Sequence, residues 1–132
     1  MRIMLDTNIL ISAFIFKSKK INELIEVLSN EHEIVICSYC VEEMEEVINK
    51  KFKVDKKSLE KFLETFSFEL VYSPSQLEEK KFEIRDEEDY IILYTAIIEN
   101  VAILITGDKD FKDVKIERPE ILTCTEFLER YI

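Results

Sequence analysis

Glycine is almost absent from the sequence, which has one glycine and two prolines in 132 residues. The dinucleotide-binding fingerprint and the P-loop both need at least two glycines in one short stretch, because the backbone there approaches the phosphates closely. Gly107 alone supplies neither loop; it lies at the turn before Asp108 and is expected to aim that carboxylate. We therefore exclude a Rossmann-type cofactor enzyme and a P-loop nucleotide hydrolase.

Long apolar runs are also missing, since no uninterrupted apolar stretch reaches the roughly 18 residues that a membrane helix needs. The sequence begins Met-Arg-Ile-Met-Leu-Asp, so Asp6 stands where a signal peptide would still be apolar. We expect a cytoplasmic protein without membrane contact.

Cysteine and histidine are scarce, with three cysteines and one histidine. An odd number of cysteines in a domain of this size favours a reducing compartment over a disulfide framework. Cys37 and Cys40 form one CxxC pair, whereas Cys124 and His32 are distant in sequence. A zinc site would need all four side chains, so we expect the cysteines to serve as small buried hydrophobic residues.

Basic residues are outnumbered, because 18 lysines and arginines face 28 acidic residues and give a formal net charge of −10. Binding to a phosphate backbone normally uses a basic face, so this balance taken alone argues against a nucleic-acid partner. Eight of the 18 basic residues nevertheless lie in two short segments, 17–20 and 50–57. These segments are either solvated helix ends or local surfaces for a polyanion.

Apolar residues are plentiful, at 47% of the chain, and the length suits one domain over residues 1–132. Short apolar runs predict strands at 2–5, 34–37, 68–72 and 101–105, with a weaker one at 114–116. Helical spacing predicts helices at 9–16, 19–29, 38–48, 59–66, 90–98 and 125–131, two of them capped by Ser38 and Thr125. The alternation predicts an α/β fold, a three-layer sandwich with a central parallel sheet of four to five strands flanked by helices.

Carboxylates follow two of the predicted strands directly. Asp6 closes the first strand, and Asp108 with Asp110 closes the fourth. In an open parallel sheet the carboxyl ends of the strands meet at one edge, and ligands bind there. These three side chains are therefore expected at a common site.

Two predicted helices add further acids to this edge. Asp89 lies in the first turn of the helix that precedes the fourth strand. In the helix that begins at Ser38, Glu43 flanks the apolar face near the strand edge, with Glu42 as the alternative.

Each acid alone has an ordinary structural interpretation as a helix cap, a turn residue or part of a solvated face. Together they are harder to explain, because carboxylates about 5 Å apart repel by about 3 kcal/mol per pair at an effective dielectric near 20. Such a cluster needs a cation or protonation. An oxygen-only ligand set suits Mg²⁺ or Mn²⁺ better than zinc.

Four short motifs carry a family resemblance: Leu5-Asp6-Thr7-Asn8, Val41-Glu42-Glu43-Met44, Asp86-Glu87-Glu88-Asp89 and Thr106-Gly107-Asp108-Lys109-Asp110-Phe111. In this order and at strand ends, they make the chain resemble the PIN-domain nucleases over its whole length. The resemblance is strongest to the branch that contains toxins of toxin–antitoxin pairs, related to VapC-type toxins.

The resemblance implies an endoribonuclease that hydrolyses RNA phosphodiester bonds with Mg²⁺ or Mn²⁺. It also implies a cognate antitoxin protein and a homodimer as assemblies. The metal-binding catalytic acids would be Asp6, Glu43, Asp89 and Asp108, with Asp110 as a fifth ligand, Asn8 and Thr106 as polar supports, and Lys50, Lys51 and Lys53 as RNA contacts.

Two other functions are compatible with an acid-rich α/β domain. A receiver-like, magnesium-dependent phosphoacceptor module would need an adjacent acidic pair near the N-terminus, but Met4 and Leu5 precede Asp6. A non-catalytic PIN scaffold gains little support, because all the expected acids are present.

Overall fold

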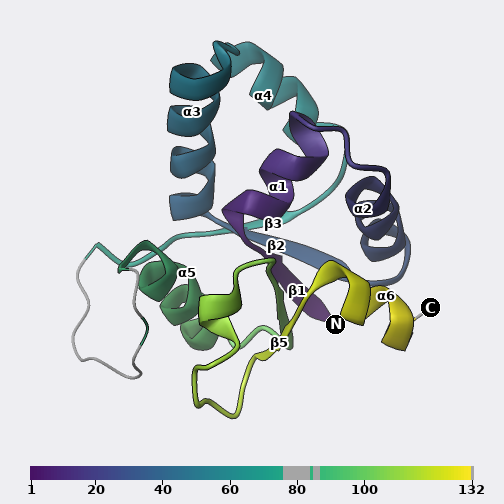
Figure 1. The fold of residues 1–132 in the computed structure, drawn as a ribbon, viewed down its shortest axis with the longest axis vertical. Coiled ribbons are helices and arrows are strands. Elements are labelled where there is room, and N and C mark those ends of the chain that lie inside the picture. Colours follow the sequence, from purple (N-terminus) through teal and green to yellow (C-terminus); the bar gives the residue numbers. More distant parts are fainter. Residues whose placement is uncertain (76–83, 85–86, 132) are drawn as a thin grey trace.

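A five-stranded sheet forms the centre of the computed structural model, which describes residues 1–75, 84 and 87–131 (Figure 1). Its strands are β1 (Arg2–Leu5), β2 (Glu33–Cys37), β3 (Glu69–Val71), β4 (Ile103–Ile105) and β5 (Glu120–Leu122). They lie in the order β3-β2-β1-β4-β5, and every neighbouring pair is parallel. The predicted parallel sheet is confirmed.

Helices cover both faces of this sheet. They are α1 (Thr7–Phe14), α2 (Lys19–Glu31), α3 (Ser38–Phe52), α4 (Lys56–Leu63), α5 (Glu87–Ile98), a short 3₁₀ turn η1 (Lys109–Phe111) and α6 (Cys124–Tyr131). Connections between parallel strands are right-handed. A helix therefore covers one face of the sheet when the chain moves from β1 towards β3, and the other face when it moves towards β5. In Figure 1, α1, α3 and α4 lie on one side of the sheet and α5 on the other, which confirms the three-layer α/β prediction.

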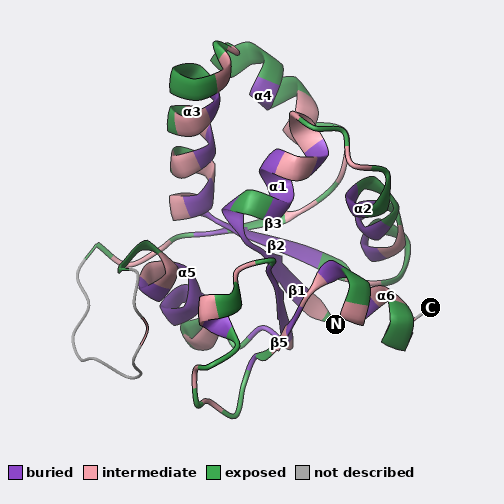
Figure 2. Cartoon of the chain, viewed as in Figure 1, coloured by how far each residue is buried: buried purple, intermediate pink, exposed green. Residues whose placement is uncertain are grey.

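The central strand β1 is buried along its whole apolar run. Ile3, Met4 and Leu5 have no exposed surface, and β2 and β4 on either side are buried as well (Figure 2). A parallel strand covered on both faces has no polar side, which explains why these runs are continuously apolar in the sequence. Cys37, Cys40 and Cys124 are buried and unbridged, as predicted.

The last strand lies later in the chain than the sequence predicts. Residues 114–116 form no strand, although Val114 and Ile116 pack against the core. The strand that pairs with β4 is instead 120–122, and the Leu122 carbonyl accepts a hydrogen bond from the Thr106 amide at 3.0 Å. This edge strand has only three residues and carries an exposed Glu120, so its apolar signal is weaker than that of 114–116.

The predicted cap of α6 is wrong. Thr123, not Thr125, precedes this helix: the Glu126 amide donates to Thr123 Oγ1 at 3.1 Å, and the Thr123 amide donates to Glu126 Oε1 at 2.9 Å. This reciprocal pair is a capping box, which satisfies two backbone donors at once. Thr125 is exposed in the first turn.

The predicted cap of α3 is also wrong. The cap position is Cys37, which makes no side-chain capping hydrogen bond, and Ser38 is the first helical residue. The Ser38 hydroxyl accepts a hydrogen bond from the Ser73 amide at 3.0 Å, so it ties α3 to the segment after β3.

Two parts of the sequence prediction lie outside the described residues: most of the charged connection between Ser75 and Arg85, and Asp86 of the acidic run. Within the described ranges, no helix combines the length and apolar character that crossing a membrane requires.

Candidate metal centre

The candidate site lies where the strand order reverses. From β1 the chain moves outward through β2 and β3, and it returns on the other side of β1 as β4 and β5. At such a switch point the connections after neighbouring strands diverge and leave a crevice at the carboxyl edge. Asp6 follows β1, and Thr106 and Asp108 follow β4.

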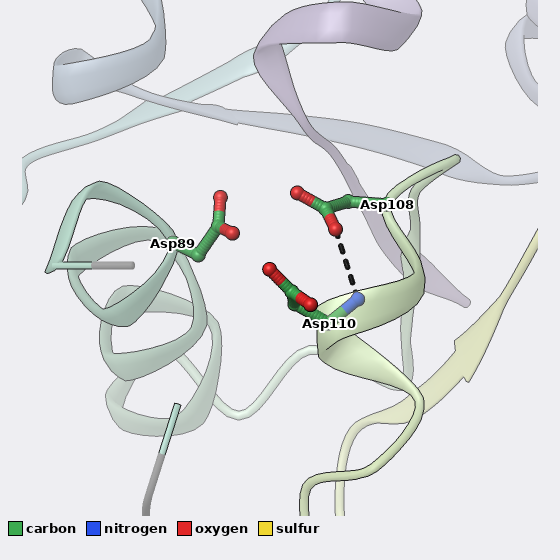
Figure 3. Close-up of side chains that lie close together, drawn as sticks. All are labelled: Asp89, Asp108 and Asp110. Atoms are coloured by element: carbon green, nitrogen blue, oxygen red, sulfur yellow. Dashed lines mark hydrogen bonds between the residues drawn. The ribbon is translucent and has the colours of Figure 1, made fainter. Parts of the chain in front are cut away.

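Three aspartates meet at this edge. Asp89 comes from the first turn of α5, and Asp108 and Asp110 come from the turn after β4 (Figure 3). One carboxylate oxygen of each lies within 4.8 Å of those of the other two, and all three residues are half-buried. The structure therefore brings Asp89 next to acids that lie up to 21 residues later in the sequence.

Local hydrogen bonds hold the β4 side of this cluster. The Asp110 amide donates to Asp108 Oδ1 at 2.9 Å, so Asp108 caps η1. The Asp108 amide donates to Thr106 Oγ1 at 3.0 Å, and the Thr106 hydroxyl donates to Asp6 Oδ2. Thr106 thus links the acid that follows β1 to the acids that follow β4.

Asp6 is almost completely buried, with 3% of its surface exposed. Its Oδ1 accepts a hydrogen bond from the Ile9 amide at 2.9 Å and caps α1. Burial raises the pKa of Asp6 to about 6, although the hydrogen bonds from Thr106 and from the Ile9 amide favour the charged form. The backbone amide of Asn8 has the same effect, while the Asn8 side chain is exposed in the first turn of α1.

Glu43 faces the same region from α3. Burial, together with the neighbouring carboxylates of Glu88 and Asp6, raises its pKa to about 7, against a hydrogen bond with Thr7 that favours the charged form. Glu42 is exposed, one position away on the helix. The orientation of Glu43 agrees with its choice over Glu42 from the sequence.

Glu88 is an acid that the sequence reasoning did not select. It lies in the first turn of α5, next to Asp89. Its carboxylate interacts with that of Glu43 and raises the pKa of Glu43. The acidic run before the helix contained the signal. Because α5 is apolar almost all round, its pattern did not show which acid of the run faces α3.

Gly107 lies at the turn that brings Asp108 to the cluster, as the sequence predicts, but nothing at this turn requires a glycine. Its φ is not positive, and a methyl group placed on its Cα would have open space within 4 Å. The turn is held by the Thr106 hydroxyl and not by the conformational freedom of glycine.

The lysines predicted to contact RNA lie away from the acids, at the end of α3. Lys50 pairs with Glu46 at 2.7 Å, and Lys51 and Lys53 are exposed. With a rise of about 1.5 Å per residue, the ten positions from Glu43 to Lys53 cover about 15 Å along the helix.

The chemistry of the cluster fits a hard divalent cation. Its donors are carboxylate oxygens, which Mg²⁺ and Mn²⁺ prefer, and within the described chain no cysteine or histidine joins a group of three potential ligands.

Comparison with known families agrees with this arrangement. A PIN domain model matches residues 2–110, a range that contains Asp6, Glu43, Asp89, Asp108 and Asp110. The chain belongs to the PIN domain family. This PIN domain is also similar to a chain in the crystal structure of VapBC2 from Rickettsia felis bound to a DNA fragment from their promoter. The two share 26% identity with a TM-score of 0.71, over 92% of this chain and 97% of the other. No curated protein matches significantly.

Proposed function

We propose that this PIN domain, residues 1–132, is a ribonuclease that depends on Mg²⁺ or Mn²⁺ and hydrolyses RNA phosphodiester bonds. The observation that supports it most is the cluster of Asp89, Asp108 and Asp110 at the switch point of the sheet. These residues are half-buried, so the cluster is partly accessible from solvent.

Asp6, Glu43, Asp89, Asp108 and Asp110 would hold the metal. When bound, the metal would lower the pKa of a coordinated water and offset the charge that develops on the phosphorus oxygens and on the leaving 3′-oxygen. Asp6 keeps acceptor capacity for this role, because a carboxylate offers about four lone-pair sites and the donors from Ile9, Asn8 and Thr106 use three of them.

Positioning residues complete this proposal. Thr106 holds the carboxylate of Asp6 and the backbone of Asp108 in one arrangement. Glu43, whose pKa is about 7 in the absence of metal, can hold a proton near neutral pH and release it when a cation binds. Asn8 would support Asp6 through its backbone amide.

We also propose that the chain is the toxin of a toxin–antitoxin pair, with a cognate antitoxin protein and a second copy of itself as partners. Support comes from the similar structure, which is described as VapBC2 bound to promoter DNA. Family membership favours this function over a receiver-like phosphoacceptor module. We expect the cytoplasm as its location.

The deciding experiment is cleavage of a labelled single-stranded RNA with Mn²⁺, with Mg²⁺ and with a chelator. We expect cleavage only with a divalent metal, and a loss of at least about a hundredfold for Asp6→Asn and Asp108→Asn, since each removes a charge that the metal needs. Asp113→Asn is the matched control, because Asp113 is exposed three residues after Asp110.

Three results would contradict the proposal. Activity that survives chelation and both site variants would indicate another mechanism or a contaminant. Absence of cleavage in a folded protein that binds Mn²⁺ would favour a non-catalytic PIN scaffold. Cleavage of DNA but not RNA under the same conditions would assign the other nucleic acid as substrate.

A further inference from the structure

The Cys37–Cys40 pair lies beside the candidate metal centre and takes no part in the proposed reaction. Cys37 ends β2 and occupies the cap position of α3, and Cys40 lies in the first turn of that helix. Both side chains have no exposed surface, and their sulfur atoms are 3.2 Å apart.

This geometry suits a covalent bond between the two sulfurs. A disulfide requires a sulfur–sulfur distance of about 2.05 Å, so a displacement of about 1 Å closes the pair. Cys124 is not part of the pair, since its Sγ lies 3.9 Å from the Lys20 carbonyl. Among the described residues, no third acid, histidine or cysteine completes a metal site with the two thiols.

The two thiols are not equivalent. The hydrogen bond between the two sulfurs, with a smaller contribution from the Ser73 hydroxyl, lowers the pKa of Cys37 to about 7. The pKa of Cys40 is raised above its usual value by the same hydrogen bond and by burial. Because the thiolate is the reactive form, Cys37 is the sulfur that reacts first and Cys40 is the resolving partner.

We propose that Cys37 and Cys40 form a reversible disulfide with peroxide as the oxidant. Because both sulfurs are buried, a small oxidant is favoured over a bulky one. The Cys37 thiolate attacks one peroxide oxygen, the O–O bond breaks, and Cys37 becomes a sulfenic acid as hydroxide leaves. Cys40 then attacks the Cys37 sulfur, the S–O bond breaks, and water is released. In total, two thiols lose two electrons and two protons, and one hydrogen peroxide becomes two waters.

The disulfide would act on the start of the helix that carries Glu43. Cys40 Sγ lies 4.0 Å from the carbonyl of Leu5, the residue before Asp6, and Glu43 follows three residues after Cys40. The covalent link would fix the first turn of α3 to the end of β2, close to the backbone that precedes Asp6.

The experiment treats the reduced, folded full chain with hydrogen peroxide and follows its intact mass. We expect a loss of two hydrogens, a peptide map that joins Cys37 to Cys40, and complete recovery with dithiothreitol. Circular dichroism before and after treatment checks that the reaction occurs in the folded protein.

Variants separate this pair from other oxidation. Cys124→Ser is expected to lose two hydrogens as the wild type does. In Cys40→Ser the loss is expected to disappear, and a dione reagent selective for sulfenic acids labels Cys37. The proposal is overturned if the folded wild type stays reduced while a small-molecule thiol added to the same sample is oxidised. A disulfide that includes Cys124, or gain of oxygen in place of loss of hydrogen, overturns it as well. The wild-type result decides even if a serine variant does not fold.

Discussion

Asp6 combines a capping role with a buried charge, and the two have opposite effects on stability. Its carboxylate caps α1, yet burial raises its pKa from 3.8 to about 6. A group whose pKa is raised in the folded state stabilises the fold fully below its unfolded pKa, and this contribution is lost as the pH rises through its folded pKa. For Asp6 the loss occurs between about pH 4 and pH 6.

We therefore expect Asp6→Asn to make the metal-free protein more stable than the wild type at pH 8, by about 1–3 kcal/mol. The amide keeps the capping oxygen without the buried charge, and the difference should nearly vanish at pH 4. Urea unfolding with a chelator at both pH values measures it. Asp113→Asn should show no such difference, and a less stable Asp6→Asn variant at pH 8 would contradict the expectation.

Strand ends made most of the acids predictable from the sequence. Asp6, Asp108 and Asp110 follow apolar runs directly, so the topology of any parallel sheet brings them to one edge. The link through Thr106 could not be derived from residue order, because it joins side chains 100 positions apart. Glu88 was missed because an apolar helix has no distinct polar face.

The contribution of the α6 capping box to stability can be measured by comparing substitutions at two neighbouring threonines. We expect Thr123→Ala to lower the free energy of unfolding by about 1 kcal/mol, because the Glu126 amide loses its acceptor. Thr125→Ala is the matched control: its exposed hydroxyl accepts a surface hydrogen bond from Lys20 but caps no helix, and we expect a change within about 0.5 kcal/mol. Chemical denaturation measures both. Equal losses of stability in the two variants would contradict the assignment of Thr123 as the cap of α6.

The lysine-rich end of α3 provides a test of how RNA crosses this PIN domain. If RNA extends from the acids along α3, Lys51 and Lys53 neutralise phosphates about 12–15 Å from Glu43. Replacing both with glutamine should then lower the slope of log affinity against log salt by about one to two. Binding to an uncleavable RNA at several salt concentrations measures the slope. Lys61→Gln with Lys115→Gln is the control for charge, and an unchanged slope in the Lys51 and Lys53 variant would exclude this path.

The sequence predicted the type of element correctly where the apolar pattern was long. The prediction failed at the edge of the sheet. Residues 114–116 have a β-branched pattern but pack beside the core without pairing, whereas Glu120–Leu122 pairs with β4 through its backbone. A three-residue edge strand depends on a partner already in place, and a local sequence window does not contain that partner.

At the scale of the whole molecule, clustered charge makes stability depend on cations. The acids at the carboxyl edge repel one another in the absence of metal, so a bound cation should stabilise the folded state by mass action. We expect Mn²⁺ at a hundred times its dissociation constant to add about 2.7 kcal/mol and raise Tm by roughly 10 °C.

Thermal unfolding with Mn²⁺, and with sodium chloride at equal ionic strength, measures this effect. Asp108→Asn should lose most of the shift, whereas Asp113→Asn should keep it. The same shift in wild type and Asp108→Asn would mean that the cation binds elsewhere.

The parallel, three-layer class followed from alternating strands and helices, but the strand order did not. The order depends on which strands pair, and Ile3 has partners at both Ile34 and Ile103. Nothing local to residues 2–5 distinguishes a central strand from an edge strand, apart from the absence of polar residues on either face.

The central place of β1 also has a consequence for biosynthesis. β1 leaves the ribosome before the four other strands of this sheet, yet its pairing with β4 must wait until residue 105 has been made. Until then one edge of β1 stays open, and the nascent chain carries Asp6 without Asp108 and Asp110. Products of premature termination before this point therefore lack the three-aspartate cluster and expose an apolar strand edge to proteases and to aggregation. Assembly of the acid site thus requires translation as far as Asp110.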